Sequence, residues 1–554
     1  MKKVLYRPLL IVIQLLVVMT SALASDGFFT VGQQNGRWWF FDPEGEIFFS
    51  TGVCVTNPEG YYAPDLGYSP YYVNIMNLYG SEEAWAEVTL DRLEQWNFNT
   101  LGAWSDIGLL GGQMPYTIVL GLAGADWQYG SMPDYFSDIF YDHVNSVVAS
   151  EVAPRADDPN LIGYFFDNEL RWGPDWRDIT DVFAEYFAFP ADAPGKIELV
   201  NFLEDRYHGD VNAFNAVWHM SITSFDDLLA MTQISPVSLD PTQREDRTEF
   251  TRAVAEQFFA TCHDAIKAAD PNHLLLGTRF VSWVAPKVVV EAIAPYTDVV
   301  TANHYVPWPF FQGLIGIIRD FFGWTDINDT LSDFYALTGK PLLITEFSVR
   351  AMDSGLPNTY PYNWFFETLQ TQQERADWFE NYARQWINSP FIIGYHWFSY
   401  MDEPPEGRFD GENSNFGLVD NNDIPWGPVV SIMTVVNSEA YNWPPIDDDS
   451  GDDDSADDDS AIDDDSGDDD SSDDDLVDDD AADDDSSDDD SVDDDSGDDD
   501  IDDDAAADDD SSIDDDIAED DDASPDDDAL DDDSAENPPP SDDDDDSGKS
   551  GCGC

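Results

Sequence analysis

The sequence predicts an α/β protein with the fold of a (β/α)8 TIM barrel. Between residues 26 and 446, short β-like runs alternate with amphipathic helical segments, which is the order of a parallel sheet covered by helices. We find eight such runs, and eight is the number of strands that closes a barrel. The alternative is an open, doubly wound sheet. It is disfavoured because no glycine-rich dinucleotide turn follows the first run.

The predicted strands are short apolar runs, at residues 48–54, 98–104, 116–120, 161–166, 274–277, 299–303, 342–346 and 392–397. The helices between them show apolar stripes at helical spacing, such as Ala376, Phe379, Ala383 and Trp386. More than 100 residues separate strands four and five, so residues 202–229 are predicted to form a helical insertion on one side of the cleft. Residues 26–47 are predicted to form a small β-hairpin that caps either the entrance or the base of the barrel.

The amino terminus has the features of a secretory signal peptide. Lys2, Lys3 and Arg7 precede an apolar run over residues 9–18, and small residues at 22–24 offer a cleavage site. The run is shorter than the roughly 20 residues that a membrane-spanning helix needs. Residues 1–24 are therefore predicted to be removed from a secreted or cell-surface protein, which leaves residues 25–446 as the barrel domain.

Residues 447–554 consist mainly of Asp-Asp-Asp blocks separated by Ser, Gly and Ala. They hold 56 Asp and 2 Glu against one Lys, and so carry 57 of the 94 formal negative charges of the chain. A segment with this charge and few apolar side chains cannot form a core, and it is predicted to be a disordered, extended spacer. Its terminal Cys552 and Cys554 are either a covalent attachment point at the cell surface or a terminus without function.

The rest of the chain still carries 37 formal negative charges. This field repels nucleic acid and acidic or sulfated polysaccharides, so a neutral polymer is the better partner.

The two cysteines outside the tail, Cys54 and Cys262, are predicted to be buried, inert thiols. The seven histidines form no metal-binding spacing, so neither a metal nor another cofactor is predicted.

Two glutamates stand at the carboxyl ends of predicted strands, where a barrel builds its active site. Glu169 follows the fourth strand and Glu346 ends the seventh, in Pro341-Leu-Leu-Ile-Thr-Glu-Phe347. A retaining glycosidase needs a carboxylate that attacks the anomeric carbon and a carboxylic acid that protonates the leaving oxygen, about 5 Å apart. For either glutamate alone an ordinary salt bridge is the better explanation, but the pair predicts this chemistry.

The neighbours of Glu169 fit the acid of such a pair. Asn168 is expected to orient a sugar hydroxyl and to hold the adjacent glutamate. The apolar Phe165, Phe166 and Leu170 are expected to favour the protonated form of Glu169.

Two longer blocks carry a resemblance to a known family. They are Phe166-Asp-Asn-Glu-Leu-Arg-Trp-Gly173, and Gly394-Tyr-His-Trp-Phe-Ser-Tyr-Met-Asp-Glu-Pro-Pro-Glu-Gly-Arg408 running on to Asp410-Gly-Glu-Asn-Ser-Asn-Phe-Gly417. Asn-Glu after strand four and Glu after strand seven resemble the signature of clan A of retaining barrel glycosidases. Within that clan, residues 30–445 resemble family 50 glycoside hydrolases, the β-agarases.

This resemblance implies agarose, or a related galactan, as substrate, Glu169 as acid/base and Glu346 as nucleophile. Two departures limit it. Many such agarases carry an amino-terminal carbohydrate-binding domain that this chain is expected to lack, and residues 202–229 also resemble barrel β-galactosidases.

Further substrate-binding residues are predicted at the ends of strands six and eight. Asn303, His304 and Tyr305 follow strand six, where the clan commonly has a Tyr that hydrogen-bonds the nucleophile. Trp397 ends strand eight, where an aromatic residue commonly forms the floor of the sugar site. His304 and His396 suit hydrogen bonds to sugar hydroxyls. A plain core aromatic is an equal alternative for Tyr305.

Four more binding residues are predicted from their loops. Glu412 and Asn413 have polar groups that bind pairs of hydroxyls, while Trp104 and Trp172 offer flat faces to the less polar side of a pyranose. Each of them alone could instead be structural.

Other functions compete with a retaining galactan hydrolase. A β-galactosidase-like barrel enzyme on another β-linked saccharide keeps the same two carboxylates. A non-catalytic carbohydrate-binding barrel would lack one of them, and both are present. A surface adhesin would depend on the acidic tail.

Overall fold

The computed structural model describes residues 27–305, 331–359 and 366–443. The predicted signal peptide at 1–24 and the acidic tail at 447–554, with Cys552 and Cys554, lie outside these residues. In the described ranges, we find no helix that is long and apolar enough to cross a membrane.

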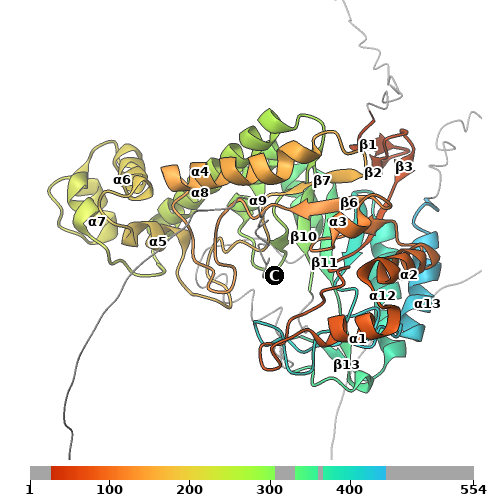
Figure 1. Cartoon of the computed structure of the whole chain (residues 1–554). Helices are drawn as coiled ribbons and strands as arrows, with labels where there is room; N and C mark the ends of the chain where they lie inside the picture. Colours follow the sequence, from red (N-terminus) through yellow and green to blue (C-terminus); the bar gives the residue numbers. More distant parts are fainter. Residues whose placement is uncertain (1–26, 306–330, 360–365, 444–554) are drawn as a thin grey trace, which may run out of the picture. The chain divides into compact units, whose positions relative to one another are not determined.

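A curled parallel sheet forms the centre of the molecule (Figure 1). Its strands follow one another in the order β8-β7-β6-β5-β4-β14-β11-β10-β9. They are β4 (Ser50–Val53), β5 (Thr100–Leu101), β6 (Tyr116–Val119), β7 (Leu161–Phe165), β8 (Leu274–Leu275), β9 (Phe280–Val281), β10 (Val300–Asn303), β11 (Leu342–Phe347) and β14 (Ile392–Trp397). Every predicted strand overlaps one of these.

The fifth predicted strand, at 274–277, corresponds to β8, and a second short strand, β9, follows it; the two lie at the two edges of this sheet. β8 pairs with β7, whereas β9 pairs with β10, and only residues 276–279 connect them. The Leu276 amide donates to the Tyr164 carbonyl at 2.8 Å, while the Val299 amide donates to the Leu275 carbonyl at 3.2 Å. This segment therefore bonds to neighbours on both sides, which is compatible with the predicted barrel.

The amino-terminal segment forms a three-stranded antiparallel sheet made of β1 (Thr30–Gln34), β2 (Arg37–Phe41) and β3 (Ile47–Phe48). Phe29, Phe40 and Phe48 form one buried cluster with side chains from the amino-terminal half of the barrel strands, namely Ile162, Leu274, Val299, Leu343 and Ile393. The predicted hairpin therefore covers the base of the sheet, the end opposite to the carboxyl ends of the strands.

Helices surround the sheet because each has one apolar face. They are α1 (Pro70–Tyr79), α2 (Glu82–Gln95), α3 (Ile107–Leu110), α4 (Asp138–Val147), α5 (Val182–Ala188), α6 (Pro194–Arg206), α7 (Val211–Trp218), α8 (Pro241–Ala269), α9 (Lys287–Ile293), α11 (Leu331–Thr338), α12 (Gln372–Ile387) and α13 (Gly427–Ser438). All four residues of the predicted stripe on α12 are buried.

Between β7 and β8 the chain forms α5, α6, α7 and α8, with a short 3-10 turn at Phe225–Ala230. The predicted insertion at 202–229 covers the end of α6, all of α7 and most of this turn. α5, α6 and α7 pack against α8, as Figure 1 shows.

The two described cysteines are buried and free, as predicted. Cys262 lies on the apolar face of α8. Burial raises the pKa of the Cys54 thiol to about 12, so this thiol stays protonated and unreactive.

Candidate active site

Glu169 and Glu346 meet at the carboxyl end of the sheet. Glu169 lies four residues beyond β7, and Glu346 lies within β11 next to its last residue. Their exposed fractions are only 8% and 5%. Parallel strands present their carboxyl ends at one edge, so residues that are far apart in the sequence are brought together.

Four residues that follow strands of the sheet have a left-handed backbone, which is rare for residues other than glycine. The φ angles are 58° at Val55, 61° at Trp104, 49° at Glu169 and 49° at Arg279. These residues follow β4, β5, β7 and β8. Each such conformation costs about 1–3 kcal/mol and persists only where the surroundings enforce it, most often at functional sites.

The carboxylate of Glu169 is held by two neutral donors. Asn303 Nδ2 donates to Oε1 at 2.9 Å, and Trp127 Nε1 donates to Oε2 at 3.1 Å. Its main chain is fixed as well, because Arg177 Nη2 donates to the Glu169 carbonyl at 2.9 Å. Glu169 therefore points in one direction, and among the described residues its side chain has no ion-pair partner.

The carboxylate of Glu346 is held by a cation and a phenol. Arg279 Nη2 donates to Oε1 at 2.6 Å, and Tyr305 Oη donates to Oε2 at 2.8 Å. Burial raises the pKa of Glu346 to about 7, and nearby Glu169 adds to the increase, whereas Arg279 and Tyr305 oppose it. The two donors fix the carboxylate and favour its ionised form.

One network connects the two glutamates. Arg279 Nη1 donates to Asn168 Oδ1 at 2.8 Å, and Asn303 Nδ2 donates to the same oxygen at 3.1 Å. Asn303 Oδ1 in turn accepts from Thr345 Oγ1 at 2.7 Å. Asn168 was predicted to orient a sugar hydroxyl and to hold its neighbour. Its side-chain oxygen accepts hydrogen bonds from Arg279, which holds Glu346, and from Asn303, which holds Glu169.

Arg279 was not found from the sequence. Its guanidinium is fully buried and lies 4.2 Å from the centre of the Trp104 ring, so the predicted Trp104 is at the site as a support for this cation. The only signal in the sequence is an Arg two residues beyond the fifth predicted strand, which is indistinguishable from a surface charge. Trp127 and Arg177 were missed for the same reason, since both lie in loops.

His304 and Tyr305 follow β10, as predicted. The His304 amide donates to the Glu346 carbonyl at 2.7 Å, and its Nδ1 lies 2.9 Å from Ser282 Oγ. Burial lowers the pKa of His304 to about 4, so its imidazole is neutral near pH 7. Tyr305 makes the contact with Glu346 that the family resemblance implies.

Three predicted binding residues have buried side chains with protein partners. Trp172 is 4% exposed and packs against Tyr135, Phe258 and Phe259. Trp397 has no exposed surface, and its Nε1 donates to the Phe416 carbonyl at 2.8 Å. His396 is also fully buried, with Nε2 2.8 Å from Ser50 Oγ. The substrate contacts of these three residues stay a prediction.

Glu412 and Asn413 lie on the loop after β14 and are partly buried. Glu412 Oε2 accepts from Arg408 Nη2 at 2.6 Å, and burial raises the pKa of Glu412 while Arg408 opposes the increase. Asn413 Oδ1 accepts from the Thr359 amide at 2.9 Å. Both residues already have protein partners, and their substrate contacts stay a prediction.

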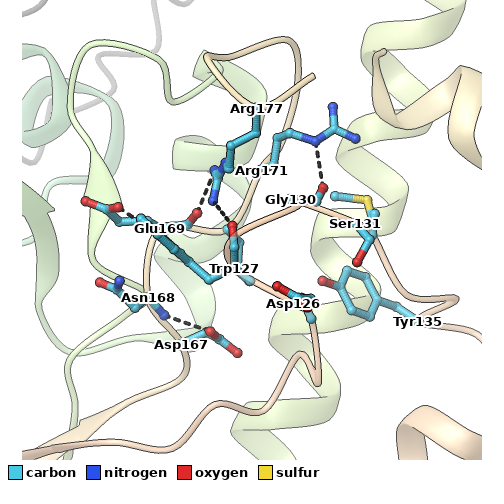
Figure 2. A pocket seen from close by; sticks show the side chains of 13 residues that line it. Asp126, Trp127, Gly130, Ser131, Tyr135, Asp167, Asn168, Glu169, Arg171 and Arg177 are labelled. Atoms are coloured by element: carbon cyan, nitrogen blue, oxygen red, sulfur yellow. Dashed lines mark hydrogen bonds between the residues drawn. The ribbon is translucent and has the colours of Figure 1, made fainter. Parts of the chain in front are cut away.

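A pocket that opens to solvent lies beside Glu169. Figure 2 shows that its walls come from the loop after β6, with Asp126 and Trp127, and from the loop after β7, with Glu169 and Arg177. In the part of the chain that the structure describes, no group of three or more His, Cys, Asp or Glu is placed to hold a metal ion.

A parallel α/β sheet with two buried, linked glutamates at its carboxyl end has the architecture of barrel glycoside hydrolases. Comparisons with known proteins agree with this class. No family model matches the chain. Beta-agarase A of Vibrio sp. (strain JT0107) is 30% identical over 474 residues, which cover 74% of this chain and 45% of that protein. Beta-agarase B of the same strain is 26% identical over 489 residues, covering 76% and 49%.

Solved structures of agarases are also similar to this chain. An exo-beta-agarase has 25% identity and a TM-score of 0.64, with 76% of this chain and 66% of that chain covered. Another agarase has 26% identity and a TM-score of 0.63, covering 76% and 65%. These similarities support an agarase-like glycoside hydrolase. The chain spans about half the length of the curated relatives that it matches.

Proposed function

We propose that this protein is a secreted, retaining glycoside hydrolase that cleaves β-1,4 galactosidic bonds in agarose or a related neutral galactan. The observation that carries the mechanism is the network in which Asn168, Arg279 and Asn303 join the two buried carboxylates. The similarity to agarases supports the substrate class. Secretion rests on the signal peptide predicted at residues 1–24.

In the first step, the Glu346 carboxylate attacks the anomeric carbon while the protonated Glu169 donates its proton to the glycosidic oxygen. The bond to the leaving sugar breaks and a glycosyl ester with Glu346 forms. In the second step, Glu169 removes a proton from water, which displaces Glu346 and restores both groups. Arg279 and Tyr305 bind the carboxylate that leaves in this second step.

The test uses the full chain with agarose, other β-galactosides, carrageenan and β-glucans, and NMR of the anomer that forms first. We expect turnover of the neutral galactan with net retention. Glu346→Gly should reduce turnover by about 10⁴-fold or more. Azide with an activated glycoside should restore part of it, because azide fits the space of the missing carboxylate. Net inversion, or full activity of Glu346→Gly, would contradict the proposal.

A further inference from the structure

Trp176 presents an exposed indole seven residues beyond Glu169, on the loop after β7. Its exposed fraction is 45%, which is high for the largest apolar side chain. The ring lies against that of Trp283, which follows β9, with centroids 5.9 Å apart and planes tilted by 36°. Trp283 is only 8% exposed. One indole is therefore packed into the protein, and it supports a second that faces solvent.

Arg177 fixes this exposed indole relative to Glu169. Its guanidinium lies 4.6 Å from the centre of the Trp176 ring. The same group donates to the carbonyls of Glu169 at 2.9 Å and Trp127 at 3.1 Å, and it pairs with Asp175 at 2.6 Å. Because the Arg177 side chain is 4% exposed, these bonds are shielded from water and the loop is held in one conformation.

A shallow pocket lies between the segments that carry the two tryptophans, although neither indole lines it. Its lining residues are 170–175 on one side and Phe280, Val281, Val284, Ala285 and Pro286 on the other. It adjoins the pocket beside Glu169, since Leu170 and Arg171 contribute to both.

The position next to Glu169 determines which part of a substrate would lie here. The proton of Glu169 goes to the glycosidic oxygen, so the departing sugar must lie within reach of this carboxyl group. Trp176 is tied to this residue, because the guanidinium that lies over its ring also donates to the Glu169 carbonyl. This link to Glu169 is our reason for assigning the indole to the leaving-group side.

We propose that Trp176, supported by Trp283 and locked by Arg177, is the stacking platform for the sugar unit on the leaving-group side of the bond that is cleaved. The ligand is a neutral β-linked pyranose, whose less polar face covers an indole well. This inference rests on the proposed function and assigns the leaving-group side of that site.

The experiment compares Trp176→Ala with the wild type on two substrates, a galactan oligosaccharide and a glycosyl fluoride, whose leaving group is a single atom and does not reach the platform. We expect kcat/KM on the oligosaccharide to fall by about three- to tenfold. The value of kcat/KM on the glycosyl fluoride should change by less than about twofold, because this substrate never uses the stacking contact. Trp176→Phe should keep most of the activity. Tyr141→Ala, an exposed aromatic on α4 with 37% exposure, is the matched control and should change neither value.

An equal loss of kcat/KM on both substrates, or no loss on either, would contradict the proposed platform. A wild type that cleaves neither substrate would instead contradict the proposed function. The platform is then tested by the affinity of the Glu346→Gly protein for the oligosaccharide. We expect this affinity to fall when Trp176→Ala is added, and an unchanged affinity would also overturn the platform.

Discussion

The two glutamates of the site occupy different surroundings. Glu346 receives a charged guanidinium and a phenol, whereas Glu169 receives an indole and an amide, both neutral. A permanent cation favours a carboxylate that stays ionised until it attacks. Neutral donors orient a carboxyl group that has to gain and lose a proton in each cycle. The partners of the two side chains, more than their burial, therefore distinguish the proposed nucleophile from the proposed acid.

The largest effect that separates the two roles is expected from Glu169→Ala. For substrates with poor leaving groups, kcat should fall by about 10²- to 10⁴-fold, because no acid protonates the departing oxygen. For a nitrophenyl glycoside, the leaving group needs little protonation and the first step should be far less affected. A series of aryl glycosides measures this dependence. Equal losses across the series would show that Glu169 is not the acid.

Arg279→Gln should have the next largest effect. It removes the cation from a buried carboxylate, and kcat/KM should fall by about 10²- to 10³-fold. Arg279 opposes the raised pKa of Glu346, so its loss raises that pKa further. An ionised nucleophile is required, and the acidic limb of the pH profile, near 7 in the wild type, should move to higher pH.

Arg279→Lys is the control for this substitution. It keeps the charge and should recover part of the activity, although it cannot form the same pair of bonds to Asn168 and Glu346. Circular dichroism and the melting temperature of both variants report whether the fold is intact. If the acidic limb does not move in a folded Arg279→Gln protein, Arg279 does not control the ionisation of Glu346.

Tyr305→Phe removes a single hydrogen bond to Glu346 and keeps the ring. We expect kcat/KM to fall by about tenfold, which is typical for a hydrogen bond to a charged group. The acidic limb should again move to higher pH, by less than in Arg279→Gln. The pH dependence of kcat/KM on one aryl glycoside provides the measurement. A limb that moves to lower pH would contradict the direction of this effect.

Trp127→Phe should have the smallest effect on activity, and it should act through Glu169. It removes one neutral donor from Glu169, and we expect a loss of about threefold for poor leaving groups. Because the acidic limb belongs to Glu346, it should stay in place. A shift of that limb, or an equal loss for nitrophenyl glycosides, would mean that Trp127 does not act through Glu169.

The strands and the two glutamates could be predicted because apolar runs and their ends are local features of the sequence. The direction of a side chain at a strand end is not local. The register between β11 and β14 shifts between Ile344 and Phe347, and Trp397 is paired with Phe347 and turned into the core. A regular two-residue alternation cannot predict such a shift.

Arg279 and Trp127 show a second limit of the sequence. The role of Arg279 depends on Glu346, which is 67 residues away, and on the ring of Trp104 beneath its guanidinium. Trp127 reaches Glu169 from a loop, 42 residues before it. Only the folded chain brings these partners within hydrogen-bond distance. No local sequence pattern indicates that a single Arg or Trp in a loop has a partner so distant along the chain.

The connection between β8 and β9 divides the sheet into two halves, and each half carries one of the two glutamates. Glu169 follows β7 in the first half, whereas Glu346 lies in β11 in the second, which comprises β9, β10, β11 and β14. Arg279 lies in the short connection between them and bonds to residues of both. The proposed hydrolysis needs both carboxylates. We therefore expect activity only from a chain in which both halves have folded and met, so that activity would report assembly.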